Sequence, residues 1–323
     1  MVSSASPSPR TQRLATELTE MMSRALVGQE AVMEQVLVAL LCRGHVLIEG
    51  VPGVAKTLLV RALSRCLGLE FKRVQMTPDL MPSDIIGTNV FEPEQRVFRL
   101  RRGPVFTALL LADEINRAPA KTQAALLEAM QERQVSIDGE TYPLDGNFTV
   151  FATQNPIEYQ GTYPLPEAEV DRFLLKVQVD YPSEQEERDL LQRVHQGFSD
   201  LDLVGAGLTT VAGAEELAQC RQEIAAITVQ EPLLAYIASV VRATRRDPQL
   251  LLGCSPRASV MLLQAAKAVA GLRGRAYATP DDVKDIAAPV LRHRLILRPE
   301  ADIEGVRAEQ VIAGVLATVP VPR

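Results

Sequence analysis

The sequence has no tryptophan, and aromatic residues make up only 4% of its 323 positions. Proteins that bind single-stranded nucleic acid stack its bases on aromatic side chains, so this composition argues against such a platform. Basic residues are not in excess either, because 34 Lys and Arg stand against 40 Asp and Glu, for a formal net charge of −6. Domains that bind duplexes usually carry a positive surface, so nucleic acid is not the expected partner.

Cysteine and histidine are also scarce. The four cysteines show no CxxC or CxxxC spacing, so metal and redox motifs lack support and buried free thiols are expected. The three histidines are far apart in the sequence. His45 opens an apolar segment, and we predict a structural residue there rather than a metal ligand.

Long apolar runs are missing as well. Residues 106–112 form one of the longest, which is far short of the ~20 residues that a membrane-spanning helix needs. Residues 1–9 have neither the basic nor the apolar part of a signal peptide. We therefore expect a disordered tail over residues 1–9, no membrane span and a cytoplasmic location.

Apolar runs of β type alternate with helical patterns through the first half of the chain. This alternation predicts a parallel sheet covered by helices on both faces. Beyond Pro182 the β-type runs fade, and helices follow whose first turns carry proline. At ~150 residues per domain the length suggests two domains: an α/β core over residues 10–181 and a smaller all-helical lid over residues 182–323. The predicted strands are residues 45–49, 71–75, 109–112, 148–152 and 174–179.

Two hairpin signals interrupt this alternation. Residues 134–137 and 140–143 flank Asp138-Gly139, which is typical of a two-residue hairpin turn. A looser turn over residues 92–96 joins a second pair of short β-type segments. We therefore expect two β-hairpin insertions in the core.

A glycine-rich segment lies between the first predicted strand and a helical pattern. A Walker A loop requires that position, because its backbone N–H groups and the helix N-terminus bind phosphate. Lys56 would reach the β- and γ-phosphates of ATP, and Thr57 would bind Mg²⁺; a glycine-rich turn with a chance Lys-Thr pair is the alternative. Ala55 stands where a glycine is expected. Alanine fits there only if its φ is negative, so we expect a negative φ at that position. The predicted nucleotide contacts are Gly50, Val51, Pro52, Gly53, Val54, Ala55, Lys56, Thr57 and Leu58.

The apolar run at residues 109–112 ends in two acids, Asp113 and Glu114. Buried strands seldom end in paired carboxylates unless a cation or a reaction needs them, although many strands end in acids at a surface. Together with the Walker A segment, the pair predicts the Walker B motif of an ATPase. Asp113 would complete the Mg²⁺ site opposite Thr57, and Glu114 would polarise the attacking water.

Three further residues have contexts that suit phosphoryl transfer. Asn155 follows a predicted strand, so it is expected at the same sheet edge as Asp113, near the water or the γ-phosphate; a plain Asn-Pro turn is the alternative. Arg172 precedes the last strand and would act on a neighbouring subunit's ATP; an ordinary solvated or salt-bridged arginine is the alternative. Arg257 lies in the first turn of a helix that Ser255 caps. A cation there opposes the helix dipole, so it requires an anion, either ATP or a carboxylate.

With these residues identified, the chain resembles the MoxR family of AAA+ ATPases over nearly its whole length. The resemblance implies an AAA+ core with an all-helical lid, the two hairpins of the helix-2-insert branch, and an active hexamer with ATP between subunits. Members of this family often carry alanine before the Walker lysine. The matching motifs include GVPGVAKT, DEINRAPAKTQAALLEAM, DGNFTVFATQNP, GTYPLPEAEVDRF and CSPRAS.

The resemblance also implies roles for individual residues and partners. By motif position, Asn155 is similar to sensor 1, Arg172 to the arginine finger and Arg257 to sensor 2. Val27 and Gly28 are similar to the contacts on the adenine side. Relatives work with von Willebrand factor A domain proteins, usually to mature a client complex or to insert a cofactor into it, so such a partner is implied here.

Three functions are compatible with these motifs. The first is an ATP-driven remodelling chaperone, whose hairpins project from a ring. The second is a DNA-translocating motor, since related rings use similar hairpins and arginines cluster beside the first one; the acidic pI of about 5.3 counts against it. The third is a nucleotide-binding scaffold with little turnover, which the intact Asp113 and Glu114 disfavour. The clustered arginines are Arg96, Arg99, Arg101 and Arg102.

Overall fold

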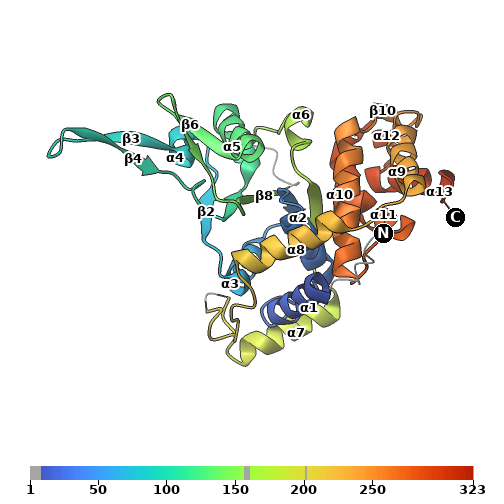
Figure 1. Ribbon diagram of the computed structural model, residues 1–323, viewed down its shortest axis with the longest axis horizontal. Coiled ribbons are helices and arrows are strands. Elements are labelled where there is room, and N and C mark those ends of the chain that lie inside the picture. The colour runs from blue at the N-terminus through green and yellow to red at the C-terminus, as the bar shows by residue number, and fades with distance from the viewer. Residues whose placement is uncertain (1–8, 156–160, 201, 323) are drawn as a thin grey trace, which may run out of the picture.

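A computed structural model of the protein describes residues 9–155, 161–200 and 202–322. Within them the main sheet has five parallel strands, in the order β2-β5-β8-β1-β9 (Figure 1). The predicted parallel sheet is therefore confirmed, whereas residues 1–8 of the predicted tail lie outside the described residues. The strands are β1 (Val46–Gly50), β2 (Phe71–Gln75), β5 (Leu109–Asp113), β8 (Thr149–Gln154) and β9 (Leu175–Val179).

Helices cover both faces of this sheet because its central strands are apolar on both sides. Leu109 and Leu111 of β5 belong to one core, which includes α1, α2 and α3 and continues into the helices of the second half. Leu110 belongs to a second core on the opposite face, with α5. The two-sided burial explains why these strands read as continuous apolar runs. The helices are α1 (Pro9–Met22), α2 (Glu30–Leu41), α3 (Lys56–Leu67) and α5 (Ala120–Glu132).

Both predicted hairpins are confirmed as antiparallel ribbons. The β3–β4 ribbon extends away from the rest of the molecule, at the left of Figure 1. At its base Gly87 and Gly103 lie back to back: a Cβ on Gly87 would lie 2.4 Å from the carbonyl oxygen of Arg101, and one on Gly103 would lie 2.3 Å from that of Ile85. Only glycine fits such an approach. The elements are α4 (Pro82–Ile86), β3 (Gly87–Glu92), β4 (Val97–Arg102), β6 (Gln134–Ile137) and β7 (Glu140–Pro143).

Helices dominate the second half, and three of them carry the predicted prolines, Pro232, Pro256 and Pro280, at their first or second position. A small antiparallel sheet of two short strands, which the sequence analysis does not predict, lies among them. The elements are α6 (Glu167–Val170), α7 (Glu184–His195), α8 (Ala214–Ala226), α9 (Glu231–Thr244), β10 (Leu250–Leu252), α10 (Pro256–Leu272), α11 (Pro280–Leu291), η2 (Arg292–Arg294), β11 (Ile296–Leu297), α12 (Pro299–Ile303) and α13 (Ala308–Thr318).

The chain that follows β9 runs back along the core before it reaches the lid helices. Arg193 of α7 donates to the carbonyl oxygen of Ser23, just beyond α1, at 2.8 Å. The amide of Val211 donates to the carbonyl oxygen of Cys66 in α3 at 2.7 Å. The domain boundary between residues 181 and 182 stays a prediction, and these contacts attach Arg193 and Val211, which follow that boundary, to the helical side of the core.

His45 is a structural residue, as predicted. Its Nδ1 accepts the amide of Val150 at 2.9 Å, and its Nε2 lies 3.1 Å from the carbonyl oxygen of Met130, so the neutral ring satisfies both neighbours. Burial lowers the pKa of His45 to about 3. Among the described residues, no helix combines the length and apolar character that a bilayer crossing requires.

Candidate nucleotide-binding site

The loop between β1 and α3 forms an open cradle. Gly53 has a φ of +87°, and nothing lies within 4 Å of the position where a Cβ would stand. Ala55 occupies the N-cap of α3 and provides no side-chain cap to the first-turn N–H groups. Amides at a helix N-terminus that lack a side-chain cap are suited to bind phosphate, so the loop fits a nucleotide.

Ala55 does not have the negative φ that the sequence analysis requires. Its φ is +59° and its ψ is +23°, in the left-handed region. For a residue with a Cβ this conformation costs roughly 1–2 kcal/mol. The expectation was wrong because the sharp turn from loop to helix needs the left-handed conformation whichever residue is present, and strain of this kind is often stored at functional sites.

Lys56 begins α3 and contacts the loop that precedes it. Its Nζ donates to the carbonyl oxygen of Gly50 at 2.5 Å, and a second contact reaches the carbonyl oxygen of Val51 at 3.4 Å. The ammonium group therefore lies within the cradle, next to the amides that would surround phosphate.

One cavity of about 670 Å³ brings together most of the predicted residues. Sequence reasoning missed its other wall, which α7 and the chain after it form with apolar side chains. A flat heterocycle suits such a wall, and the polar loop suits phosphates. The predicted residues that line the cavity are Pro52, Gly53, Ala55, Lys56, Thr57, Leu58, Asp113, Glu114 and Asn155; the others are Thr153, Leu190, Leu191, Val194, Phe198, Ser199 and Asp200.

Asp113 is held in place from two neighbouring strands. The hydroxyl of Thr153 in β8 donates to Asp113 Oδ1 at 2.5 Å, and Arg73 in β2 donates to Oδ2 from Nε at 3.0 Å and from Nη2 at 2.6 Å. The hydroxyl of Thr57 and the carboxylate of Asp113 line the same cavity, and hard oxygen ligands of this kind suit Mg²⁺. The residues present therefore fit the metal.

Glu114 follows the strand in a left-handed conformation, with a φ of +58°. Its amide donates to the Thr153 hydroxyl at 2.8 Å, so one threonine positions both acids. Its carboxylate oxygen Oε2 accepts from Gln75 Nε2 at 2.9 Å and lies 3.0 Å from Arg117 Nε. Sequence reasoning named the segment that holds Thr153 but assigned a role only to Asn155, which is buried here.

Among the residues that the structure describes, Arg172 and Arg257 are not part of the lining of this cavity. Arg172 donates to the carbonyl oxygen of Leu127 in α5 at 2.9 Å. Arg257 Nη1 lies 3.9 Å from the carboxylate of Asp171, which also accepts from Arg294 Nε at 2.6 Å. A carboxylate thus meets Arg257, the alternative that the sequence analysis left open. We call Arg172, Arg257 and Arg294 the arginine cluster.

Val27 and Gly28 are not among the residues that line the cavity, although a neighbour connects them to it. Gln29 Nε2 donates to the carbonyl oxygen of Val54 at 3.1 Å, so their segment is fixed to the Walker loop. A Cβ on Gly28 would lie 2.0 Å from Glu186 Oε1, which shows how closely α7 approaches. Their predicted role beside adenine stays a prediction.

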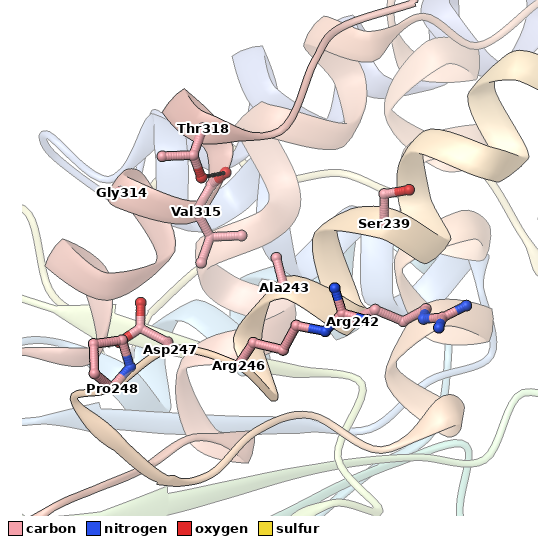
Figure 2. Close-up of a pocket in the computed structure, with 9 residues that line it drawn as sticks. All are labelled: Ser239, Arg242, Ala243, Arg246, Asp247, Pro248, Gly314, Val315 and Thr318. Atoms are coloured by element: carbon pink, nitrogen blue, oxygen red, sulfur yellow. Dashed lines mark hydrogen bonds between the residues drawn. The ribbon is translucent and has the colours of Figure 1, made fainter.

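A separate cavity of about 650 Å³ lies between α9 and α13 (Figure 2). Arg242 and Arg246 extend along one side, and Gly314 and Val315 line the other. None of the predicted site residues lines it. Of these two cavities, the one at the Walker loop therefore holds the predicted nucleotide-binding residues.

Known proteins match this chain over most of its length. A family model described as ATPase family associated with various cellular activities matches residues 45–175, and one described as AAA lid domain matches residues 242–315. Chaperone MoxR1 of Mycobacterium tuberculosis is 46% identical, over 94% of this chain and 81% of its own. The chain belongs to the MoxR family of AAA+ ATPases.

Two further comparisons extend the likeness beyond one relative. YeaC of Bacillus subtilis is 43% identical, over 96% of this chain and 95% of its own. A solved structure from Cytophaga hutchinsonii has a TM-score of 0.89 and 40% identity, and the match covers 97% of this chain and 96% of that one. The MoxR fold, an AAA+ core followed by a helical lid, therefore describes the whole chain.

Proposed function

We propose that this MoxR-family protein is a Mg²⁺-dependent ATPase. One observation carries the proposal: Lys56, Thr57, Asp113, Glu114 and Asn155, which lie far apart in the sequence, line a single cavity. Phosphoryl transfer needs a cradle for phosphates, ligands for Mg²⁺ and a group that orients water, and this cavity offers all three. A scaffold without turnover would not need the strained Glu114.

The roles follow from the contacts. The loop amides and Lys56 would bind the β- and γ-phosphates, and Thr57 and Asp113 would hold Mg²⁺, which neutralises phosphate charge when it is bound. Glu114 would turn from Gln75 toward the attacking water and orient it. Asn155, at the end of the same sheet edge, would contact the water or the γ-phosphate.

We infer that hydrolysis takes place at subunit interfaces of a ring, a hexamer as in the family resemblance. The supporting observation is that Arg172 and Arg257 lie outside the cavity of their own chain. In a ring, these two arginines would complete a neighbour's site. The ring would be cytoplasmic.

We further propose that ATP turnover remodels or matures a client protein complex, with a von Willebrand factor A domain protein as partner. The β3–β4 hairpin supports a protein client, because its exposed side chains include Phe91 and Phe98. They are 48% and 71% exposed, and their rings contact each other in a tilted arrangement with centroids 5.2 Å apart. Exposed apolar clusters of this kind mark protein-interaction sites. The relative MoxR1 of Mycobacterium tuberculosis is also named a chaperone.

The experiment is to measure ATPase activity and particle mass together over a protein dilution series, for the wild type and for Arg172→Ala. We expect specific activity to rise with assembly, and the variant to assemble but to lose ~10³-fold or more of its activity. Activity that is independent of protein concentration would contradict hydrolysis at interfaces. Strong, salt-sensitive stimulation by DNA would redirect the proposal to a DNA-translocating motor.

A further inference from the structure

Arg73 contacts the metal-binding acid of the site, although no sequence motif contains it. It lies on β2, beside β5, and both its Nε and its Nη2 donate to Asp113 Oδ2, at 3.0 and 2.6 Å. The Thr153 hydroxyl donates to Oδ1. A carboxylate offers about four lone-pair positions, so these three hydrogen bonds leave Asp113 about one for any other ligand.

The two partners of this ion pair differ in exposure. The Asp113 side chain is only 12% exposed, whereas that of Arg73 is 48% exposed. An uncompensated carboxylate at the depth of Asp113 is costly, so a cation must accompany it when no metal is bound. Arg73 provides that cation and, being half exposed on a long side chain, can move into solvent at little cost.

We propose that Arg73 is a tethered cation that occupies Asp113 in the metal-free protein and has to release it when Mg²⁺ binds. The reason is charge: a divalent ion and a guanidinium on one carboxylate repel each other, so the pair competes with the metal. Arg73 is then a positioning residue that sets the Mg²⁺ concentration at which nucleotide binds. This inference rests on the proposed function.

The chain offers a matched control on the same strand. Lys72 is the neighbour of Arg73 in β2, but its Nζ donates to the carbonyl oxygen of Phe106 at 2.9 Å and pairs with Glu70 at 3.3 Å. Lys72→Gln therefore removes one positive charge from β2 without touching Asp113. Arg73→Gln removes the same charge at the acid.

The experiment titrates Mg²⁺ against binding of a fluorescent ADP analogue, and records melting temperatures in EDTA and in Mg²⁺ with ADP. We expect Arg73→Gln to reach half-maximal binding at a Mg²⁺ concentration about two- to fivefold lower than the wild type and Lys72→Gln, the range that partly exposed charge pairs produce. Its melting temperature should fall in EDTA and recover with Mg²⁺ and ADP. Arg73→Lys, which keeps the charge, should need nearly as much Mg²⁺ as the wild type.

Two results would overturn the inference. Equal Mg²⁺ requirements in the wild type, Arg73→Gln and Lys72→Gln would make Arg73 merely structural. A higher requirement in Arg73→Gln would show that Arg73 prepares Asp113 for the metal instead of competing with it. Either result leaves nucleotide binding by the wild type intact, whereas a wild type that binds no nucleotide at any Mg²⁺ concentration would overturn the proposed ATPase as well.

Discussion

The nucleotide cavity and the arginine cluster differ in how much of a reaction centre one chain provides. In the cavity, the ends of parallel strands bring Lys56, Asp113 and Glu114 together. In the arginine cluster, Arg172 donates to the carbonyl oxygen of Leu127 and Arg257 lies near the carboxylate of Asp171. We infer from this difference that one chain of this fold would supply the proposed phosphate and metal site, while Arg172 and Arg257 lie outside it.

The strongest test of this comparison is to inactivate the cavity in one chain and the arginine cluster in another, and to mix the two chains in one ring. Lys56→Ala should lose nucleotide binding, and Arg172→Ala should lose ~10³-fold or more of its activity. If Arg172 serves a neighbour, rings mixed from the two variants contain some interfaces with both residues intact, and activity returns. The measurement is ATPase activity of the mixture against each variant alone; a mixture as inactive as its components would place Arg172 in its own chain's site.

Glu114→Gln tests the cavity itself. The amide keeps the shape and the hydrogen bonds to neighbours but cannot accept a proton, so hydrolysis should fall by ~10²–10⁴-fold. Nucleotide affinity should change little, because the phosphate cradle is untouched. Steady-state hydrolysis and binding of a fluorescent nucleotide check the two halves of this prediction, and a parallel loss of binding would contradict the role assigned to Glu114.

Within the arginine cluster, two arginines meet the same carboxylate with different strength. The Arg294 side chain is 1% exposed and lies 2.6 Å from Asp171, so Arg294→Ala should lower the free energy of unfolding by about 3 kcal/mol. Arg257 is 46% exposed and lies 3.9 Å away, so Arg257→Ala should cost ~1 kcal/mol or less. Denaturant unfolding measures both, and equal effects would contradict this ranking.

Acid should destabilise the protein through His293, which lies beside Arg294 of the arginine cluster. Burial, followed by the charge of Arg294, holds the pKa of His293 well below its ordinary value. The unfolded chain then binds the proton more readily, so stability is lost as the pH falls below ~6.5, at ~1.4 kcal/mol per pH unit. His45, whose pKa burial lowers to about 3, adds a loss of the same sign. Denaturant unfolding should therefore show a lower stability at pH 5 than at pH 7, and equal stabilities would contradict the prediction.

The smallest effect concerns the strained loop. Ala55→Gly removes the cost of the left-handed conformation but gives the unfolded chain more freedom, so a net gain of about 0.5–1 kcal/mol in stability is expected. The comparison is with Arg257→Ala in the arginine cluster, which is expected to lower the stability by a similar amount. Thermal unfolding without nucleotide measures it, and a lower stability in Ala55→Gly would mean that the loop is not strained.

Much of the fold could be predicted from the sequence because local signals and burial agree. Continuous apolar runs predicted the parallel strands, which are buried on both faces. The turn at Asp138-Gly139 predicted one hairpin, and its two strands have the predicted bounds. The β10–β11 pair was missed, since β10 has only three residues and lies among helices.

The candidate site was only partly predictable, because some of its contacts depend on the order of strands. Arg73 and Gln75 reach the acids only because β2 lies next to β5. The sequence contains no signal of that neighbour relation, nor of the return of α7 to the cavity. Ala55 shows a third limit, because motif position cannot reveal the sign of φ.

The back-to-back glycines under the β3–β4 hairpin have a mechanical consequence. At the base of the ribbon the backbone around Gly87 and Gly103 is packed so closely that no side chain fits there, so the ribbon joins the core through a narrow base. Its strands of six residues, at ~3.3 Å per residue, make an arm of ~20 Å. A small rotation of the hairpin about its base would therefore move Phe91 and Phe98, near the tip, much further than the residues at the base.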